Sequence, residues 1–187
     1  MRIITGSAKG TTLYTLEGDA TRPTSERAKE ALFSMLQFDL EGRRVLDLFA
    51  GSGQLGLEAL SRGAAFCQFV DASPAAADIV KKNAAKTRLQ AASAVAVSDY
   101  AAFLRRPPQE GFDIVFLDPP YASDCLRGAL ERLRGSSFLR RGALLACESG
   151  TGEILQKYPE LALGYTLVKS KHYGRIHYDI LTPKEEN

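Results

Sequence analysis

Two short stretches of the sequence combine residue types whose spacing could do chemistry. The first, "DLFAGSGQLG", carries glycines in the pattern Gly51-x-Gly53-x-x-Gly56. Glycine lets a backbone turn tightly and come close to a ligand, where a side chain would collide. A helix that starts near Gln54 would direct its N–H groups toward that ligand. This stretch therefore predicts a cofactor-binding loop.

An acid follows this loop at the end of the next apolar run. A carboxylate at Asp71 could accept both hydroxyl protons of a ribose. Adenosine is common to NAD and S-adenosylmethionine, so these residues alone fit both cofactors. Asp47 separates them, because it would repel a pyrophosphate but attract a sulfonium and an ammonium. The alternatives are that Asp47 only caps a loop amide, and that the glycines and Asp71 only shape turns.

The second stretch, "FDIVFLDPPY", places Asp118-Pro119-Pro120-Tyr121 directly after an apolar run. Two prolines cannot continue a strand ladder, so the chain must leave the sheet in a stiff, extended form. The amine on a nucleic-acid base is a poor nucleophile, because its lone pair is delocalised into the ring. The Asp118 carboxylate and the Pro119 carbonyl could accept its two N–H protons and aim the nitrogen at a methyl donor, with Tyr121 stacked on the base. The alternative is an ordinary strand exit with a half-buried tyrosine.

The elements that must position these residues alternate along the chain. We expect strands at 45–48, 65–71, 94–97, 112–117 and 143–148, helices at 54–61, 74–87, 100–104, 126–133 and 152–157, and a final antiparallel hairpin of 164–172 and 175–181. Such alternation predicts an α/β fold with a parallel sheet and helices on both faces. Ligands gather beyond the carboxyl ends of such strands. There lie Asp47 to Gly53, Asp71, Ser98-Asp99 and the Asp-Pro-Pro-Tyr stretch; Asp99 could bind an adenine amino group or only cap the next helix.

Residues 1–40 stand apart from this pattern. Their first half resembles a small β-hairpin, and "TRPTSERAKEALFSML" reads as a helix with Thr24 as N-cap. Its apolar stripe is formed by Leu32, Phe33, Leu36 and Met35. We expect a single domain over 1–187, with an N-terminal hairpin and helix at 1–40 and a catalytic core at 41–187.

Composition limits the class of protein. A net charge of +2 excludes a histone-like binder, although a local basic face remains compatible with it. The three separated cysteines and two histidines suggest neither a zinc site nor a disulfide framework, so no metal is expected. No apolar run approaches the roughly 20 residues that span a bilayer. We expect a cytoplasmic monomer that is not bound to membranes.

"DLFAGSG", an acid after the second strand and then "DPPY" resemble the seven-stranded S-adenosylmethionine-dependent methyltransferases that act on amino nitrogens. "RIITGSAKG", "RPTSERAKEALFSML", "ACES" and "KSKHYG" narrow the resemblance to bacterial enzymes that methylate the N2 amine of a guanine in small-subunit (16S) ribosomal RNA. The resemblance implies a Rossmann-like class I sheet and S-adenosylmethionine as cofactor. It implies a guanine site at Asp118, Pro119, Pro120 and Tyr121, and a cofactor site at Asp47, Phe49, Ala50, Gly51, Ser52, Gly53, Gly56, Asp71, Ser98 and Asp99.

Two basic segments are candidates for contact with ribosomal RNA or the small subunit. Arg22, Thr24 and Arg27 lie around a helix start, where hydroxyls and arginines suit phosphates. The second segment is the densest basic run, and its interleaved aromatics suit nucleic acid. Its candidates are Lys169, Lys171 and Tyr173. The alternatives are a solvated helix start and the solvent-facing side of a strand.

Three other functions compete with this interpretation. An amino methyltransferase for DNA, another RNA or a small molecule would use the same chemistry, but the DNA enzymes need a recognition insert for which this length has little room. A non-catalytic RNA-binding assembly factor would have no use for the paired acceptors of the Asp-Pro-Pro-Tyr stretch. An NAD-dependent oxidoreductase is disfavoured by Asp47.

Overall fold

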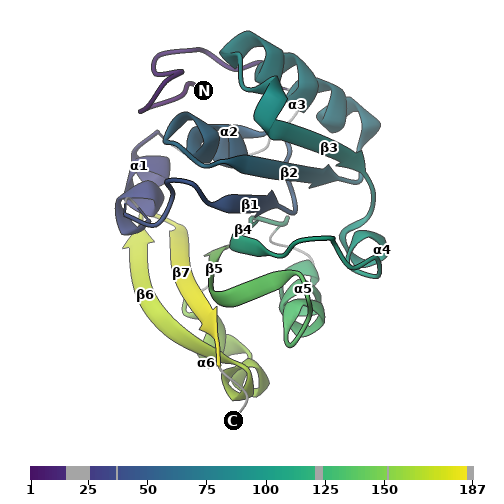
Figure 1. Cartoon of the computed structure of the whole chain (residues 1–187). Helices are drawn as coiled ribbons and strands as arrows, with labels where there is room; N and C mark the ends of the chain where they lie inside the picture. Colours follow the sequence, from purple (N-terminus) through teal and green to yellow (C-terminus); the bar gives the residue numbers. More distant parts are fainter. Residues whose placement is uncertain (16–25, 37, 121–123, 151, 185–187) are drawn as a thin grey trace.

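The computed structural model describes residues 1–15, 26–36, 38–120, 124–150 and 152–184. The sheet contains β1 (Arg44–Asp47), β2 (Phe66–Asp71), β3 (Ser93–Val97), β4 (Phe112–Leu117), β5 (Leu139–Ser149), β6 (Tyr165–Tyr173) and β7 (Ile176–Pro183). Their spatial order is β3-β2-β1-β4-β5-β7-β6. The first five strands pair in parallel, and β7 pairs antiparallel with both β5 and β6. The expected α/β fold with a parallel sheet and a C-terminal antiparallel hairpin is confirmed (Figure 1).

Helices cover both faces of this sheet (Figure 1). They are α1 (Glu26–Met35), α2 (Gln54–Ser61), α3 (Pro74–Thr87), α4 (Tyr100–Phe103), α5 (Cys125–Leu133) and α6 (Ile154–Lys157), with short 3-10 turns at Gln90–Ala92 and Pro159–Leu163. One buried cluster joins α1, α2 and α3 to one face, and a second joins α5 and α6 to the other. The central strand β4 is buried on both faces, which explains its continuous apolar run "FDIVFL".

Residues 1–13 form a hairpin with less strand pairing than the sequence suggests. A single bridge pairs Arg2 with Thr12. The amides of Ile4 and Thr5 donate instead to the carboxylate of Glu58 on α2, at 2.8 and 3.0 Å. The segment is therefore bonded to a helix and does not extend a sheet.

A buried ion pair fixes α1 against α2. The Lys29 ammonium lies 3.1 Å from the Glu58 carboxylate, and both side chains are fully buried. The same ammonium donates to the carbonyl of Arg2 at 2.6 Å, and Arg62 donates to Glu58 at 2.8 Å. The apolar stripe of α1 is buried as expected, with Leu32, Phe33, Leu36 and Met35 in the core. The expected N-cap, Thr24, lies outside the described residues.

Strand β5 begins four residues earlier than the sequence predicts. Leu139 pairs with Phe112, and the register then shifts before Ile114 pairs with Leu144. Gly142 takes a φ of 72° within this irregular part. A bulge of this kind breaks the hydrophobic alternation from which a strand is recognised.

Candidate active site

The carboxyl ends of the parallel strands bring the predicted cofactor and guanine residues to one edge of the sheet. Asp47 ends β1 opposite Phe116 of β4, and Asp71 ends β2 opposite Val97 of β3. Strand β4 ends at Leu117, so Asp118 is the first residue beyond it. The described candidates of these two sets therefore share the edge that the sequence indicates. Tyr121 lies outside the described residues.

The glycine loop between β1 and α2 is built as the spacing predicts. Gly51 and Gly53 have φ of 53° and 78°, in the left-handed region that glycine adopts without strain. A Cβ built on Gly51 would meet no atom within 4 Å, so this side of the loop is open. Gly56 has another role, because its Cβ would lie 2.3 Å from the Phe69 ring. Gly51 thus leaves room for a ligand, Gly53 packs closely against Val80 of α3, and Gly56 lets α2 pack closely on β2.

Asp47 is buried directly beneath this loop, with 2% of its surface exposed. Its carboxylate accepts a hydrogen bond from the Gly56 amide at 3.0 Å, so the amide-capping alternative describes one of its contacts. Burial, and secondarily the charge of Asp71, raises the pKa of Asp47 to about 7, against the lowering effect of the Gly56 bond. A cationic ligand would stabilise the ionised form.

Asp71 connects the loops that follow β1 and β2. Its two carboxylate oxygens accept from the amides of Gly51 and Ser73, each at 2.8 Å. Each oxygen keeps a further lone pair, so the contacts leave acceptor capacity for ribose hydroxyls. Ser73 in turn accepts from Ala76 and caps α3, where Pro74 is the first residue.

At the end of β3, Ser98 donates its amide to the Asp71 carbonyl at 2.9 Å. Asp99 caps α4 by accepting from Ala101 and Ala102, at 2.9 and 3.2 Å. The capping alternative is thus seen in the structure, whereas contact with adenine stays a prediction. Phe49 lies 5.4 Å from the ring of Tyr100 on α4, which places an aromatic surface at the same edge.

Asp118 has an acidic neighbour that the sequence reasoning did not select. The register pairs Leu117, the last residue of β4, with Cys147 of β5, so the next residues, Asp118 and Glu148, lie at corresponding positions. Glu148 is 5% exposed. Burial, followed by the charges of Glu148 and Asp47, holds the pKa of Asp118 well above its usual range. The sequence did contain an indication of Glu148, because it is an acid within the otherwise apolar fifth strand, "ALLACES".

Three buried or half-buried carboxylates therefore lie at one edge: Asp47, Asp118 and Glu148. Such a site favours ligands that bring positive charge or N–H donors, and disfavours a pyrophosphate. The open glycine loop above Asp47 fits the sulfonium and ammonium of S-adenosylmethionine. When bound, this cofactor supplies an activated methyl group on sulfur.

The predicted RNA contacts divide into three groups. Arg22 and Thr24 lie outside the described residues, and Arg27 is exposed on α1. Lys171 is exposed and Tyr173 half-buried near the β6–β7 turn, which lies at the same edge as Asp118 because β6 runs parallel to β5. The ammonium of Lys169 donates to the Met35 carbonyl at 2.6 Å, a contact that ties β6 to the end of α1.

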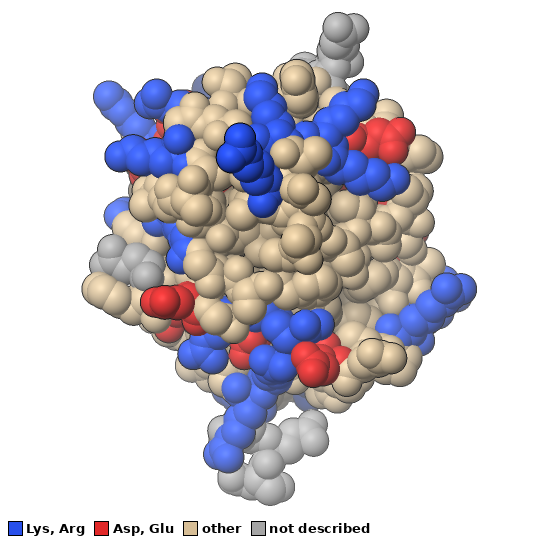
Figure 2. All heavy atoms as spheres, turned by 45° about the horizontal axis from the view of Figure 1, so that its top comes forward, with Lys and Arg blue, Asp and Glu red and all other residues tan. Residues whose placement is uncertain are grey.

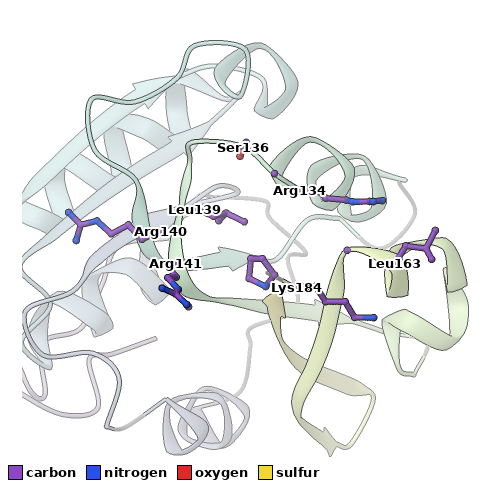
Figure 3. Close-up of a pocket in the computed structure, with 11 residues that line it drawn as sticks. Arg134, Ser136, Leu139, Arg140, Arg141, Leu163 and Lys184 are labelled. Carbon is purple, nitrogen blue, oxygen red and sulfur yellow. The ribbon is translucent and has the colours of Figure 1, made fainter. Parts of the chain in front are cut away.

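A cavity of about 400 Å³ lies at the opposite, amino-terminal edge of β5. Its basic lining residues are Arg134 at the end of α5, Arg140 and Arg141 on β5, and Lys184 after β7 (Figure 3). Arg140 is paired with Asp113 at 3.1 Å and with Glu110 at 3.4 Å. None of the predicted site residues that the structure describes lines this cavity. The candidate active site is therefore defined by the strand ends and the glycine loop, not by this cavity.

The described residues contain no helix long and apolar enough to cross a membrane. Within those same ranges, no group of three or more His, Cys, Asp and Glu side chains is arranged to hold a metal ion.

The sheet order, the glycine loop and the acids at the strand ends define an S-adenosylmethionine-dependent methyltransferase. The chain belongs to the family described as "Conserved hypothetical protein 95", whose model matches residues 1–182. It is 36% identical to ribosomal RNA small subunit methyltransferase D of Haemophilus influenzae, covering 95% of this chain and 91% of the relative. The identity to the protein of the same name from Escherichia coli K12 is 33%, covering 95% and 87%.

Solved structures agree with this assignment. "Putative methyltransferase yhhF from Escherichia coli" is similar with a TM-score of 0.86 and 30% identity, covering 100% of this chain and 99% of that chain. "SMU.776, a putative methyltransferase complexed with SAH" has a TM-score of 0.68 at 15% identity, covering 81% and 48% of the two chains, and shows the shared fold alone. The expectations of family, fold class and cofactor are thereby confirmed.

Proposed function

We propose that the protein transfers a methyl group from S-adenosylmethionine to the exocyclic N2 amine of a guanine in small-subunit (16S) ribosomal RNA. The observation that carries this proposal is the position of Asp118, half-buried just beyond β4 and at the same edge as the open glycine loop. The names of the relatives, which are ribosomal RNA small subunit methyltransferases, support the choice of RNA.

The proposed chemistry is alignment of a weak nucleophile. The carboxylate of Asp118 and the carbonyl of Pro119 accept the two N–H protons of the amine and hold its nitrogen toward the methyl group. A bond forms between nitrogen and the methyl carbon while the bond from that carbon to sulfur breaks, and the sulfur keeps the electron pair. The methylated nitrogen then loses a proton to Asp118 or to water. Alignment and stabilisation of the developing positive charge supply the rate enhancement.

The neighbouring carboxylate suggests how a guanine would be selected. Guanine presents N1–H beside its N2 amine, so two donors lie on one edge of the base. Glu148 lies beside Asp118, and in this proposal it accepts N1–H while Asp118 and Pro119 accept from N2. Adenine has no N–H at this position and could not make this second contact, so the two neighbouring acceptors would favour guanine over adenine.

The test is methyl transfer from tritiated S-adenosylmethionine to small subunits from a strain that lacks the modification. Asp118→Asn should lower kcat by about 10²–10⁴-fold and leave cofactor affinity, measured by calorimetry, within about twofold. Glu148→Gln should lower activity on guanine while preserving cofactor binding. The modified nucleotide is then mapped by mass spectrometry of the RNA.

Three results would contradict the proposal. Full activity of Asp118→Asn would remove its role. Methyl incorporation at a base other than guanine would refute the stated specificity. Transfer to DNA oligonucleotides but not to ribosomal RNA would favour a different substrate for the same amine chemistry.

A further inference from the structure

Most of the exposed charged side chains of helix α3 are positively charged. The helix carries three exposed lysines, and an exposed arginine follows its last residue: Lys81, Lys82, Lys86 and Arg88. The one acid of residues 74–88 is Asp78. This net charge of +3 exceeds the +2 of the whole chain. Figure 2 shows Lys and Arg side chains gathered on the upper part of the face that includes α3 and the N-terminal segment, with few acidic side chains among them. The remainder of the chain is thus close to neutral.

An exposed aromatic ring lies against these cations. Tyr14 is 51% exposed, and the Lys86 ammonium lies 4.2 Å from the centre of its ring. Cations beside an exposed aromatic surface are typical of proteins that bind RNA, because phosphates contact the cations and bases stack on the ring. A solvated helix face would account for the lysines, but not for a large ring held in solvent beside them.

The backbone of Tyr14 is fixed by a buried side chain. Asn83, which is fully buried in α3, accepts from the Tyr14 amide at 2.8 Å and donates to its carbonyl at 3.0 Å. The exposed ring is therefore attached to an immobilised backbone, which lowers the ordering cost of binding. Asn83 also donates to the carbonyl of Ser52 in the glycine loop at 2.9 Å. The charged surface is thus one side chain away from the cofactor loop.

We infer that Tyr14 and the exposed cations of α3 form a docking surface for the phosphate backbone of the RNA that carries the target base. The inference rests on the proposed function for the identity of the RNA. The proposed surface is a second place of RNA contact, on the β2–β3 side of the sheet. The first is the basic turn between β6 and β7, which carries the candidates Lys171 and Tyr173. RNA held at both places would span the edge at which Asp118 lies.

Charge reversal at two exposed lysines tests this surface. Binding of a full-length 16S ribosomal RNA transcript is measured by filter binding over a series of KCl concentrations. Lys82→Glu/Lys86→Glu should weaken binding at low salt by about 10–100-fold and reduce the slope of log K against log salt by about 2. Tyr14→Ala should weaken binding by about 5–100-fold, the range expected for loss of one stacking contact, and leave the melting temperature unchanged.

The chain offers a matched control at the far side of the molecule. Lys157 lies 5.0 Å from the ring of Tyr158, which reproduces the lysine–tyrosine pair in another place. Lys157→Glu/Lys184→Glu changes the net charge equally at exposed positions. If this control weakens binding as much as the α3 variant, or more, the inference is overturned. It is also overturned if the α3 variant and Tyr14→Ala bind like the unmodified protein.

Separate readouts distinguish this inference from the proposed function. Cofactor binding, measured by calorimetry, should be unchanged in Lys82→Glu/Lys86→Glu, which shows that the variant is folded. If α3 proves essential for RNA binding but no methyl group reaches guanine, the proposed function fails and the docking surface stands. If guanine is methylated with the same KM for small subunits in the α3 variant, the docking surface fails and the proposed function stands.

Discussion

The buried ion pair between Lys29 and Glu58 predicts a large and specific loss of stability. The perturbation is Glu58→Gln, which keeps the size of the side chain but removes its charge. In the folded protein Glu58 accepts from Lys29, from Arg62 and from the amides of Ile4 and Thr5. The substitution keeps an amide oxygen that can accept from Lys29, but the fully buried ammonium loses the opposing charge of Glu58, and its other described acceptor is the neutral carbonyl of Arg2.

The magnitude follows from this burial. Removing one partner of a buried pair costs about 3–5 kcal/mol, whereas an exposed pair contributes about 0–1 kcal/mol. For a chain of this length, each kcal/mol lowers the melting temperature by about 2–4 °C, so a fall on the order of 10 °C is expected. Lys29→Met should cost less, because Glu58 then retains Arg62 and two amides. The double variant should cost less than the sum of the single variants.

Urea unfolding followed by circular dichroism measures these differences. The matched control is Glu131→Gln, the same substitution in an exposed pair with Arg127 at 3.8 Å. If Glu58→Gln is no more destabilising than Glu131→Gln, the argument from burial is refuted. Additive single variants would show that the two side chains do not act as a pair.

Three further predictions concern the candidate active site. The raised pKa of Asp47, about 7, favours the folded state below the ordinary value of 3.8, and this contribution is lost as the pH rises through 7. Thermal stabilisation by S-adenosylmethionine should therefore increase from about pH 6 to about pH 8, since the cationic cofactor stabilises the ionised carboxylate. Asp47→Asn should remove that increase, and equal stabilisation at both pH values would contradict the assignment. Asp71→Ala removes the acceptor of two amides and should weaken cofactor affinity in calorimetry by at least about tenfold; unchanged affinity would exclude a role in binding. Gly56→Ala places a Cβ against Phe69, and the expected overpacking cost of about 1–3 kcal/mol exceeds the gain of roughly 0.5–1 kcal/mol from removing a helix glycine. A Gly56→Ala protein that resists urea better would show that α2 can move away from β2.

The positions of the strand ends were predictable because local patterns specify them. Apolar runs closed by glycine or proline locate β1 and β4, and the parallel sheet then brings Asp47, Asp71 and Asp118 to one edge. No long-range contact had to be known for this step. The same reasoning placed β2 and α3 within one residue of their observed bounds.

Contacts between distant side chains could not be predicted in this way. Lys29 and Asn83 are polar residues within helices, a pattern that indicates solvent exposure, yet both are fully buried. Their burial depends on Glu58 and on the backbone of Tyr14, which lie far away in the sequence. Lys169 is a further example. It lies in a basic run that predicts contact with RNA, yet its ammonium donates to the carbonyl of Met35 at the end of α1. These differences arise from tertiary partners and not from local propensity.

The insertion of β7 between β5 and β6 sets an order of assembly during synthesis. β6 leaves the ribosome before β7, but its neighbour in the sheet is β7. The five parallel strands and the glycine loop can therefore associate while β6 still has no strand partner. The basic turn between β6 and β7 reaches its place only when the last strand enters the sheet. A nascent chain would thus become able to hold its cofactor before it completes the surface that we propose to contact RNA.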